Sequence, residues 1–349
     1  MLDINTKQNI ILNVSRWIQI VRVAEDGRYI VVEGFQRDET PLTEIRNQSR
    51  QLIRSIKKVI VGDKEVFYIL PVAIQKRIPT INIVLFLATI ITTLMAGTLM
   101  EGQNPFSHPS AILVGIPFSL TLLLILGVHE LGHFMLARKH HVDATLPYFI
   151  PAPTFIGTFG AFIKMRSPVR NRRALVEIGA AGPILGFLVA LPALFIGLSL
   201  SKVVPVTGTA GVQLGDSILM KIASALIFPG LESGQDIMLH PVGFAAWIGM
   251  LVTMLNLLPI GQLDGGHIAY ALLGRYYSYV SWGALIATGL LSIISINWLV
   301  WAALVFFLVR VKHPPIYDDN APLNLYEKLI GITALMIFIL TFVPVPFKT

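Results

Sequence analysis

Long apolar stretches follow one another along the chain after residue 76. One membrane crossing needs roughly 20 apolar residues. On that measure the sequence predicts seven spans, at residues 80–100, 111–137, 174–200, 241–259, 279–296, 297–311 and 327–345. The fifth and sixth spans are short and meet at "SINW", so they could be one long helix. The pattern therefore predicts an all-α polytopic membrane protein with six or seven transmembrane helices.

Two stretches between the spans have other patterns. The segment "LGDSILMKIASALIF" (214–228) is interrupted by Asp216 and Lys221, which favours an amphipathic helix at the membrane interface over a further span. The segment "TFIGTFGAFIKM" (154–165) alternates small and bulky residues and contains two glycines. That alternation predicts a re-entrant β-hairpin buried in protein, with a plain structural loop as the alternative.

The first 76 residues differ from the rest. Two β-rich runs meet at Asp26-Gly27, a strong hairpin signal. "TPLTEIRNQSRQLIRSIKK" predicts a helix with Thr40 as N-cap and Pro41 at its first position, and "EVFYILPV" predicts a further strand. The expected organisation is a small soluble α+β module, a membrane-embedded core, and a C-terminal loop with a last transmembrane helix, at residues 1–76, 77–312 and 313–349.

Composition agrees with a membrane protein. The chain is 54% hydrophobic and 13% charged, with a mean hydropathy of +0.70, whereas an ordinary soluble domain is about 25% charged. It has no cysteine, which excludes disulfides and Cys-based metal sites. The N-terminus "MLDINTKQNI" has no signal-peptide h-region and is not typical of a transit peptide.

Positive charge indicates how the spans are oriented. The net charge is +7, and because the basic residues mostly flank the spans, topology and anionic lipid explain it better than nucleic acid does. "EGQNPFSHPS" after the first span has no Lys or Arg, whereas alternate connections are basic: Lys57, Lys58, Lys64, Lys76, Arg77, Arg138, Lys139, Lys164, Arg166, Arg170, Arg172, Arg173, Arg275, Arg310 and Lys312. Since cytoplasmic loops carry the excess of Lys and Arg, we expect a multi-pass protein of the cell membrane with a cytosolic N-terminus.

The motif "HELGH" lies at the predicted cytosolic end of the second span. On a helix, His129 and His133 are one turn apart and share a face, so their imidazoles can bind one metal ion together. Glu130 can then act as general base on a metal-bound water, whose pKa zinc lowers to about 7. The alternative is two histidines hydrogen-bonded in a helix bundle, but ionisable groups within a span are costly and usually functional.

A second polar cluster, "NLLPIGQLDGGH" (256–267), ends the fourth predicted span on the same side of the membrane. The two spans can therefore bring His129, His133 and Asp264 together. Three protein ligands that leave one position open are typical of a catalytic zinc site. "LDGG" by itself would indicate a helix-ending turn, but together with "HELGH" it favours a metal site.

Other residues compete with Asp264 as third ligand. A metzincin needs Gly at position 136 and His at 139, where this chain has Leu and Lys. His267 ranks second, as a residue that supports the ligands.

Three further residues are candidate ligands. His140 and His141 lie in a basic loop and are expected to be solvated. Glu177 opens the third span, with Arg172 and Arg173 as its simpler partners.

Three motifs occur in an order that resembles the site-2 protease family of intramembrane zinc metalloproteases: "HELGH", "GTFGAFIKMRSP" (157–168) and "NLLPIGQLDGG". "GAAGPILGF" (179–187) is also similar to the family's next helix. The resemblance covers about residues 111–311 and extends through "VKHPP" to the C-terminus. The PDZ insert of some bacterial members is not evident, and the module at 1–76 is the accessory element instead.

The resemblance implies roles for five residues. It implies one zinc ion per chain, held by His129, His133 and Asp264. It also implies Glu130 as the base and Asn256 as a substrate or oxyanion contact. The implied reaction is hydrolysis of a peptide bond in or near a transmembrane helix, in regulated intramembrane proteolysis. The implied partners are a single-span membrane protein substrate and the lipid bilayer, with no nucleic acid.

Such a reaction has two physical requirements. Lipid holds no water, and a transmembrane helix hides its carbonyls in hydrogen bonds. Cleavage therefore needs a polar cavity reached from the cytosol and a locally unwound substrate. A site near the cytosolic helix ends meets the first need, and a strand edge of the 154–165 hairpin could hold the unwound substrate by β-augmentation.

Two other functions use similar residues. A metal transporter also places His and Asp in its spans, but it tends to repeat them along a pathway in paired halves, and this chain has one cluster and no repeat. An inactive scaffold that binds membrane partners would not require Glu130. Metal-dependent cleavage of a membrane peptide by the purified protein separates the three functions.

The predicted orientation can be tested by cysteine labelling, because the chain has no cysteine of its own. A cysteine at Asn104 should react with an impermeant thiol reagent on intact cells, and a cysteine at Asn171 only after lysis. The opposite pattern would place the active site at the outer face.

Overall fold

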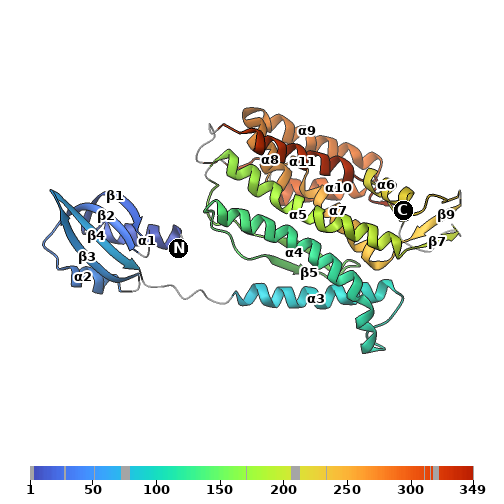
Figure 1. Cartoon of the computed structure of the whole chain (residues 1–349), viewed down its shortest axis with the longest axis horizontal. Coiled ribbons are helices and arrows are strands. Elements are labelled where there is room, and N and C mark those ends of the chain that lie inside the picture. Colours follow the sequence, from blue (N-terminus) through green and yellow to red (C-terminus); the bar gives the residue numbers. More distant parts are fainter. Residues whose placement is uncertain are drawn as a thin grey trace. The chain divides into compact units, whose positions relative to one another are not determined.

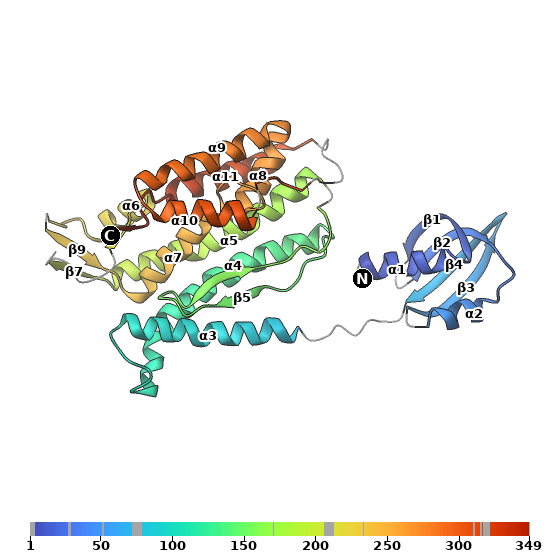
Figure 2. The same cartoon turned by 180° about the vertical axis from the view of Figure 1, so that it is seen from behind.

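A computed structural model describes residues 4–26, 29–50, 52–71, 79–169, 171–205, 213–232, 234–309, 311–314, 316 and 322–348. The chain divides into two compact units, Met1–Ile78 and Pro79–Thr349 (Figures 1 and 2).

The first unit is a small α+β module. Its antiparallel sheet has the strand order β1-β2-β4-β3, formed by β1 (Ile18–Asp26), β2 (Tyr29–Gln36), β3 (Ile53–Val61) and β4 (Lys64–Pro71). Two helices accompany it, α1 (Ile4–Val14) and α2 (Leu42–Gln48). One core joins the helices to the sheet, with Ile10, Ile45 and Phe67 fully buried in it. The predicted hairpin is present as β1 paired with β2, although Gly27 lies outside the described residues.

The helix expected after residue 40 is wrong in two respects. Its N-cap position is Pro41 rather than Thr40, and it ends at Gln48. The rest of the stretch forms β3, in which Ile53 and Ile56 both face the core. Their spacing of three imitates a helix because the ladder to β4 shifts register between Ile53 and Ser55.

The second unit is mainly helical, as expected. Among the described residues, three helices are long and apolar enough to cross a membrane: α3 (Thr80–Met100), α4 (Ile116–Lys139) with the 3₁₀ turn Pro109–Gly115 before it, and α5 (Arg172–Ser199). The other helices are shorter: α6 (Ile218–Ile227), α7 (Pro241–Asn256), α8 (Asp264–Leu273), α9 (Tyr277–Leu290), α10 (Asn297–Leu304) and α11 (Leu325–Thr341). The total of six or seven crossings stays a prediction. The fifth and sixth predicted spans are separate helices, α9 and α10, with the turn Leu291–Ile293 between them.

The segment after α7 differs from the prediction. The fourth predicted span continues to residue 259, but α7 ends at Asn256 and a loop follows. Pro259 has no backbone N–H to continue a helix, and Gly261 has a φ of +58°. Asp264 therefore begins the next helix, α8, instead of ending the previous one.

Among the residues that the structure describes, the second unit also has three two-stranded sheets. They pair β5 (Tyr148–Pro151) with β6 (Thr158–Phe162), β7 (Lys202–Pro205) with β9 (Gln235–Met238), and β8 (Gln213–Leu214) with β10 (Phe347–Lys348). The predicted hairpin corresponds to β5 and β6, whose strands begin earlier in the chain than expected. Whether it re-enters a membrane stays a prediction.

The β5–β6 hairpin lies against α3 and α4 (Figures 1 and 2). The side-chain amide of Asn82 on α3 donates to the carbonyls of Leu146 and Pro147, at 2.9 and 2.8 Å. The hydroxyl of Thr92, also on α3, donates to the carbonyl of Gly157 at 2.6 Å. A Cβ at Gly157 would lie 2.5 Å from the carbonyl oxygen of Thr92, so only glycine allows this approach.

Candidate metal centre

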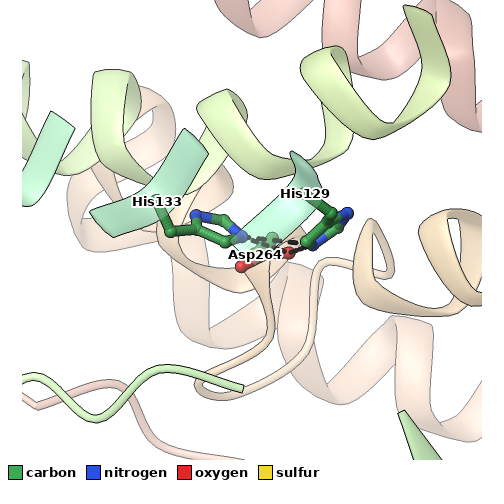
Figure 3. Close-up of side chains that lie close together, drawn as sticks. All are labelled: His129, His133 and Asp264. Carbon is green, nitrogen blue, oxygen red and sulfur yellow. Dashed lines mark hydrogen bonds and ion pairs between the residues drawn. The ribbon is translucent and has the colours of Figure 1, made fainter. Parts of the chain in front are cut away.

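The two histidines of "HELGH" lie in the second half of α4. His129 and His133 are one turn apart, and their side chains point to the same side of the helix (Figure 3). Both residues are buried, at 3% and 5% exposure. Asp264, the first residue of α8, reaches the same place from a different part of the chain.

The three side chains form an almost regular triangle of ligand atoms. The Nε2 atoms of His129 and His133 are 3.2 Å apart, and each is 3.2 Å from Oδ2 of Asp264 (Figure 3). Ligand atoms about 2.0–2.1 Å from a tetrahedral zinc ion lie about 3.3 Å from one another. The spacing and the donor set therefore fit one zinc ion with a fourth position left open.

A backbone hydrogen bond fixes the tautomer of His133. Its Nδ1 lies 2.7 Å from the carbonyl oxygen of Ile178 on α5. Because a carbonyl can only accept, Nδ1 carries the proton, and Nε2 keeps the lone pair that a metal needs.

Glycines of α5 make room for the two imidazoles. A Cβ at Gly182 would overlap the Nε2 of His133, and a Cβ at Gly186 would lie 3.1 Å from the ring of His129. On the other helix, a Cβ at Gly132 would lie 2.8 Å from the carbonyl oxygen of Ala181. Together these positions let α4 and α5 approach closely enough for the rings to fit between them.

Two glycines also set the position of Asp264. A Cβ at Gly265 would overlap the carbonyl oxygen of Leu257, and a Cβ at Gly266 would overlap that of Gly261. The start of α8 can therefore fold tightly back on the loop that follows α7.

Glu130 is buried beside the triangle, at 6% exposure. Its carboxylate interacts electrostatically with His129, His133 and Asp264, and the backbone N–H of Ile163 hydrogen-bonds to it. Ile163 directly follows β6, so the hairpin reaches the centre at this point.

The rival ligand His267 has a different partner. Its Nδ1 lies 2.6 Å from Nε2 of His313. Asn256 is the last residue of α7 and is half-buried. The roles proposed for these residues, and for the three ligands, stay predictions.

The expected partners of Glu177 are wrong. Its carboxylate accepts from Lys139 at 2.8 Å and pairs with His140 at 2.9 Å, so His140 is not merely solvated. Arg172 and Arg173 instead donate to the backbone carbonyls of Ala271, which is part of α8, and of Pro322. Such pairings join residues that are distant in sequence, so no local sequence pattern predicts them.

Comparison with known proteins agrees with the geometry. A model of peptidase family M50 matches residues 117–290. The chain is 36% identical over 252 residues to a probable zinc metalloprotease EGY2, chloroplastic, of Arabidopsis thaliana, an alignment that covers 70% of this chain and 44% of the relative. The chain belongs to peptidase family M50, the site-2 protease family.

Further M50 relatives carry the same description. A probable zinc metalloprotease EGY2, chloroplastic, of Oryza sativa subsp. indica is 32% identical over 74% of this chain and 48% of its own length. The corresponding EGY1 protein of Arabidopsis thaliana is 32% identical over 66% of this chain and 43% of its own length. The chain thus spans about half the length of the curated relatives it matches. No solved structure matches it.

The matched M50 region contains every residue of the triangle, and zinc is the metal for which the relatives are named. The predicted family and cofactor are therefore confirmed. The sequence does not indicate the carbonyl of Ile178 as a partner of His133, because a backbone atom leaves no signal in the residue type. The close approach of α4 and α5 does have a sequence signal, since Gly182 and Gly186 of "GAAGPILGF" are four residues apart on the α5 face that meets the two histidines.

The glycine at position 182 gives a sharp test of the centre. Gly182→Ala should displace the ring of His133 and lower zinc occupancy of the purified protein, because the new Cβ overlaps Nε2. Gly283→Ala on α9 is the matched control, since a Cβ there meets nothing within 4 Å. Metal analysis of both variants checks the prediction, which fails if Gly182→Ala keeps full zinc.

Proposed function

We propose that the chain is an intramembrane zinc metalloprotease that hydrolyses a peptide bond in or near a transmembrane helix of a membrane protein. The observation that carries the proposal is the triangle of His129, His133 and Asp264 next to Glu130, with both histidines and Glu130 on a helix apolar enough to cross a membrane. A soluble protease has no reason to bury this chemistry in such a helix.

The ligands and the base divide the work. When bound, zinc supplies Lewis acidity toward water and toward the substrate carbonyl. Glu130 takes a proton from the attacking water as the oxygen–carbon bond forms, and gives a proton to the departing amide nitrogen as the carbon–nitrogen bond breaks. Its burial among the ligands keeps the carboxylate close to the reacting atoms.

The β5–β6 hairpin is the proposed substrate-binding edge. Within the described part of the chain, β6 pairs only with β5, so its second edge is open for an added strand. Phe159 on this strand is 72% exposed, which suits contact with an apolar peptide. Because the next residue after β6 bonds to Glu130, a substrate strand on this edge would lie near the base. Asn256 is the proposed polar contact to that substrate.

The proposed substrate is a single-span membrane protein, cut in regulated intramembrane proteolysis. Apolar helices support a membrane location, for which we propose the cell membrane. The basic connections between the spans favour an orientation with the site near the cytosolic side. An unwound segment of a single helix is the simplest peptide that can reach a buried site.

A conservative change at Glu130 tests the general base. Glu130→Gln should keep its zinc, because the residue is not a ligand, while cleavage of a membrane peptide should fall about 10²–10⁴-fold. His133→Ala and Asp264→Ala should instead lower the zinc content. Metal analysis and a cleavage assay with detergent-purified protein measure both effects. A Glu130→Gln protein with wild-type activity would end the assignment, and wild-type protein that holds zinc but cuts nothing would favour a transporter or a scaffold.

Helix stability at the cleavage site should control the rate. Replacing a good helix former with Gly costs a helix about 1 kcal/mol, so if unwinding precedes the slow step, cleavage should rise about fivefold. A series of single-span substrates that differ only at this position checks the expectation, with Leu slower than Gly. Equal rates across the series, together with equal cleavage of soluble extended peptides, would mean that unwinding plays no part.

A further inference from the structure

We infer that α9 positions the loop that leads to Asp264, through the side chains of Tyr277 and Ser281. This inference rests on the proposed zinc site and assigns it two positioning residues outside the motifs. Neither residue belongs to the ligand triangle.

The two side chains hold both polar groups of one peptide residue. The hydroxyl of Tyr277 donates to the carbonyl of Gly261 at 2.9 Å, and the N–H of Gly261 donates to the hydroxyl of Ser281 at 3.2 Å. Tyr277 is 4% exposed and Ser281 is fully buried. Because these groups are shielded from water, the N–H and carbonyl of Gly261 must find their hydrogen-bond partners within the protein.

Gly261 is the point at which the loop must be held. The loop of residues 257–263 joins α7 to α8 without regular structure, and Gly261 adopts a φ of +58° within it. The carbonyl oxygen of Gly261 also lies directly beneath Gly266, where a Cβ would overlap it. A shift of Gly261 would therefore shift the first turn of α8, which begins with Asp264.

The same two residues connect the loop to the segment after α10. Ser281 accepts from Gly261 and donates to the carbonyl of Val311 at 3.1 Å. Two residues further on, His313 stacks on Tyr270 of α8, with ring centroids 4.2 Å apart. Tyr270 in turn contacts the ring of Tyr277, at 5.4 Å.

The hydrogen bond between His267 and His313 closes this network on the α8 side. The loop is thereby held by hydrogen bonds to α9 and packs against the first turn of α8. His267 thus supports the position of α8 by holding the 311–313 segment.

A ligand triangle with 3.2 Å edges tolerates little movement of one corner. Loss of a group that orients a metal ligand typically costs 10–100-fold in metal affinity. Tyr277→Phe removes one oxygen and leaves the carbonyl of Gly261 without its donor, while the ring contact with Tyr270 is kept. Ser281→Ala removes the partner of the Gly261 N–H and of the Val311 carbonyl.

The test measures zinc affinity of the full-length purified protein by competition with a chelator. Tyr277→Phe and Ser281→Ala should each weaken zinc binding by about 10-fold or more. The loss of zinc affinity in the double variant should be smaller than the product of the two single-variant losses, because both side chains bind the same residue, Gly261. Thr288→Val is the matched control: its hydroxyl is also buried on α9, but it donates to Ala284 of the same helix, and it should bind zinc like the wild type.

A second measurement separates positioning from general destabilisation. Cobalt substituted for zinc reports ligand geometry in its visible absorption spectrum, which should change in both variants and not in Thr288→Val. If Ser281→Ala yields too little folded protein, Tyr277→Phe carries the test. Unchanged affinity and spectra, or an equal loss in Thr288→Val, would overturn the inference and leave the proposed protease intact. Wild-type protein that binds no zinc would refute the proposed function itself.

Discussion

The close approach of α4 to α5 is the constraint on which the metal centre depends. Gly182 and Gly186 leave room for the two imidazoles, and Gly132 lets the backbones come together. At this distance the carbonyl of Ile178 can accept from His133, which directs Nε2 toward the metal. A larger side chain on either face would separate the helices and remove both the space and the hydrogen bond.

This arrangement buries polar groups among apolar helices. Each such group needs a partner, because burial separates it from bulk water. The three ligand side chains lie within 3.2 Å of one another and would hold the zinc ion together, and Glu130 has the backbone N–H of Ile163 as its partner. The irregular loop before Asp264 is satisfied by α9 in the same way. The centre is therefore a buried polar cluster whose members support one another. The proposed substrate would have to leave its own helix before its peptide bond could enter this cluster.

Sequence patterns predicted those features of the metal centre that depend on residues close together in the chain. The "HELGH" spacing gives one helical turn, and the matched depth of a second cluster indicated Asp264. They did not predict that Asp264 starts a helix, because the turn depends on contacts of Gly265 and Gly266 with the preceding loop. The strand β3 was mistaken for helix since a register shift imitates the helical spacing. Long-range pairs such as Glu177 with Lys139, or Tyr277 with Gly261, have no sequence signal at all.

The central claim is that His129, His133 and Asp264 hold one zinc ion with an open fourth position. X-ray absorption at the zinc edge of the purified protein tests it most directly. We expect one zinc per chain with two imidazole ligands, the remaining nearest ligands being oxygen atoms at about 2.0–2.2 Å. A third imidazole, which would bring His267 or another histidine into the centre, or a zinc ion surrounded by oxygen alone, would contradict it.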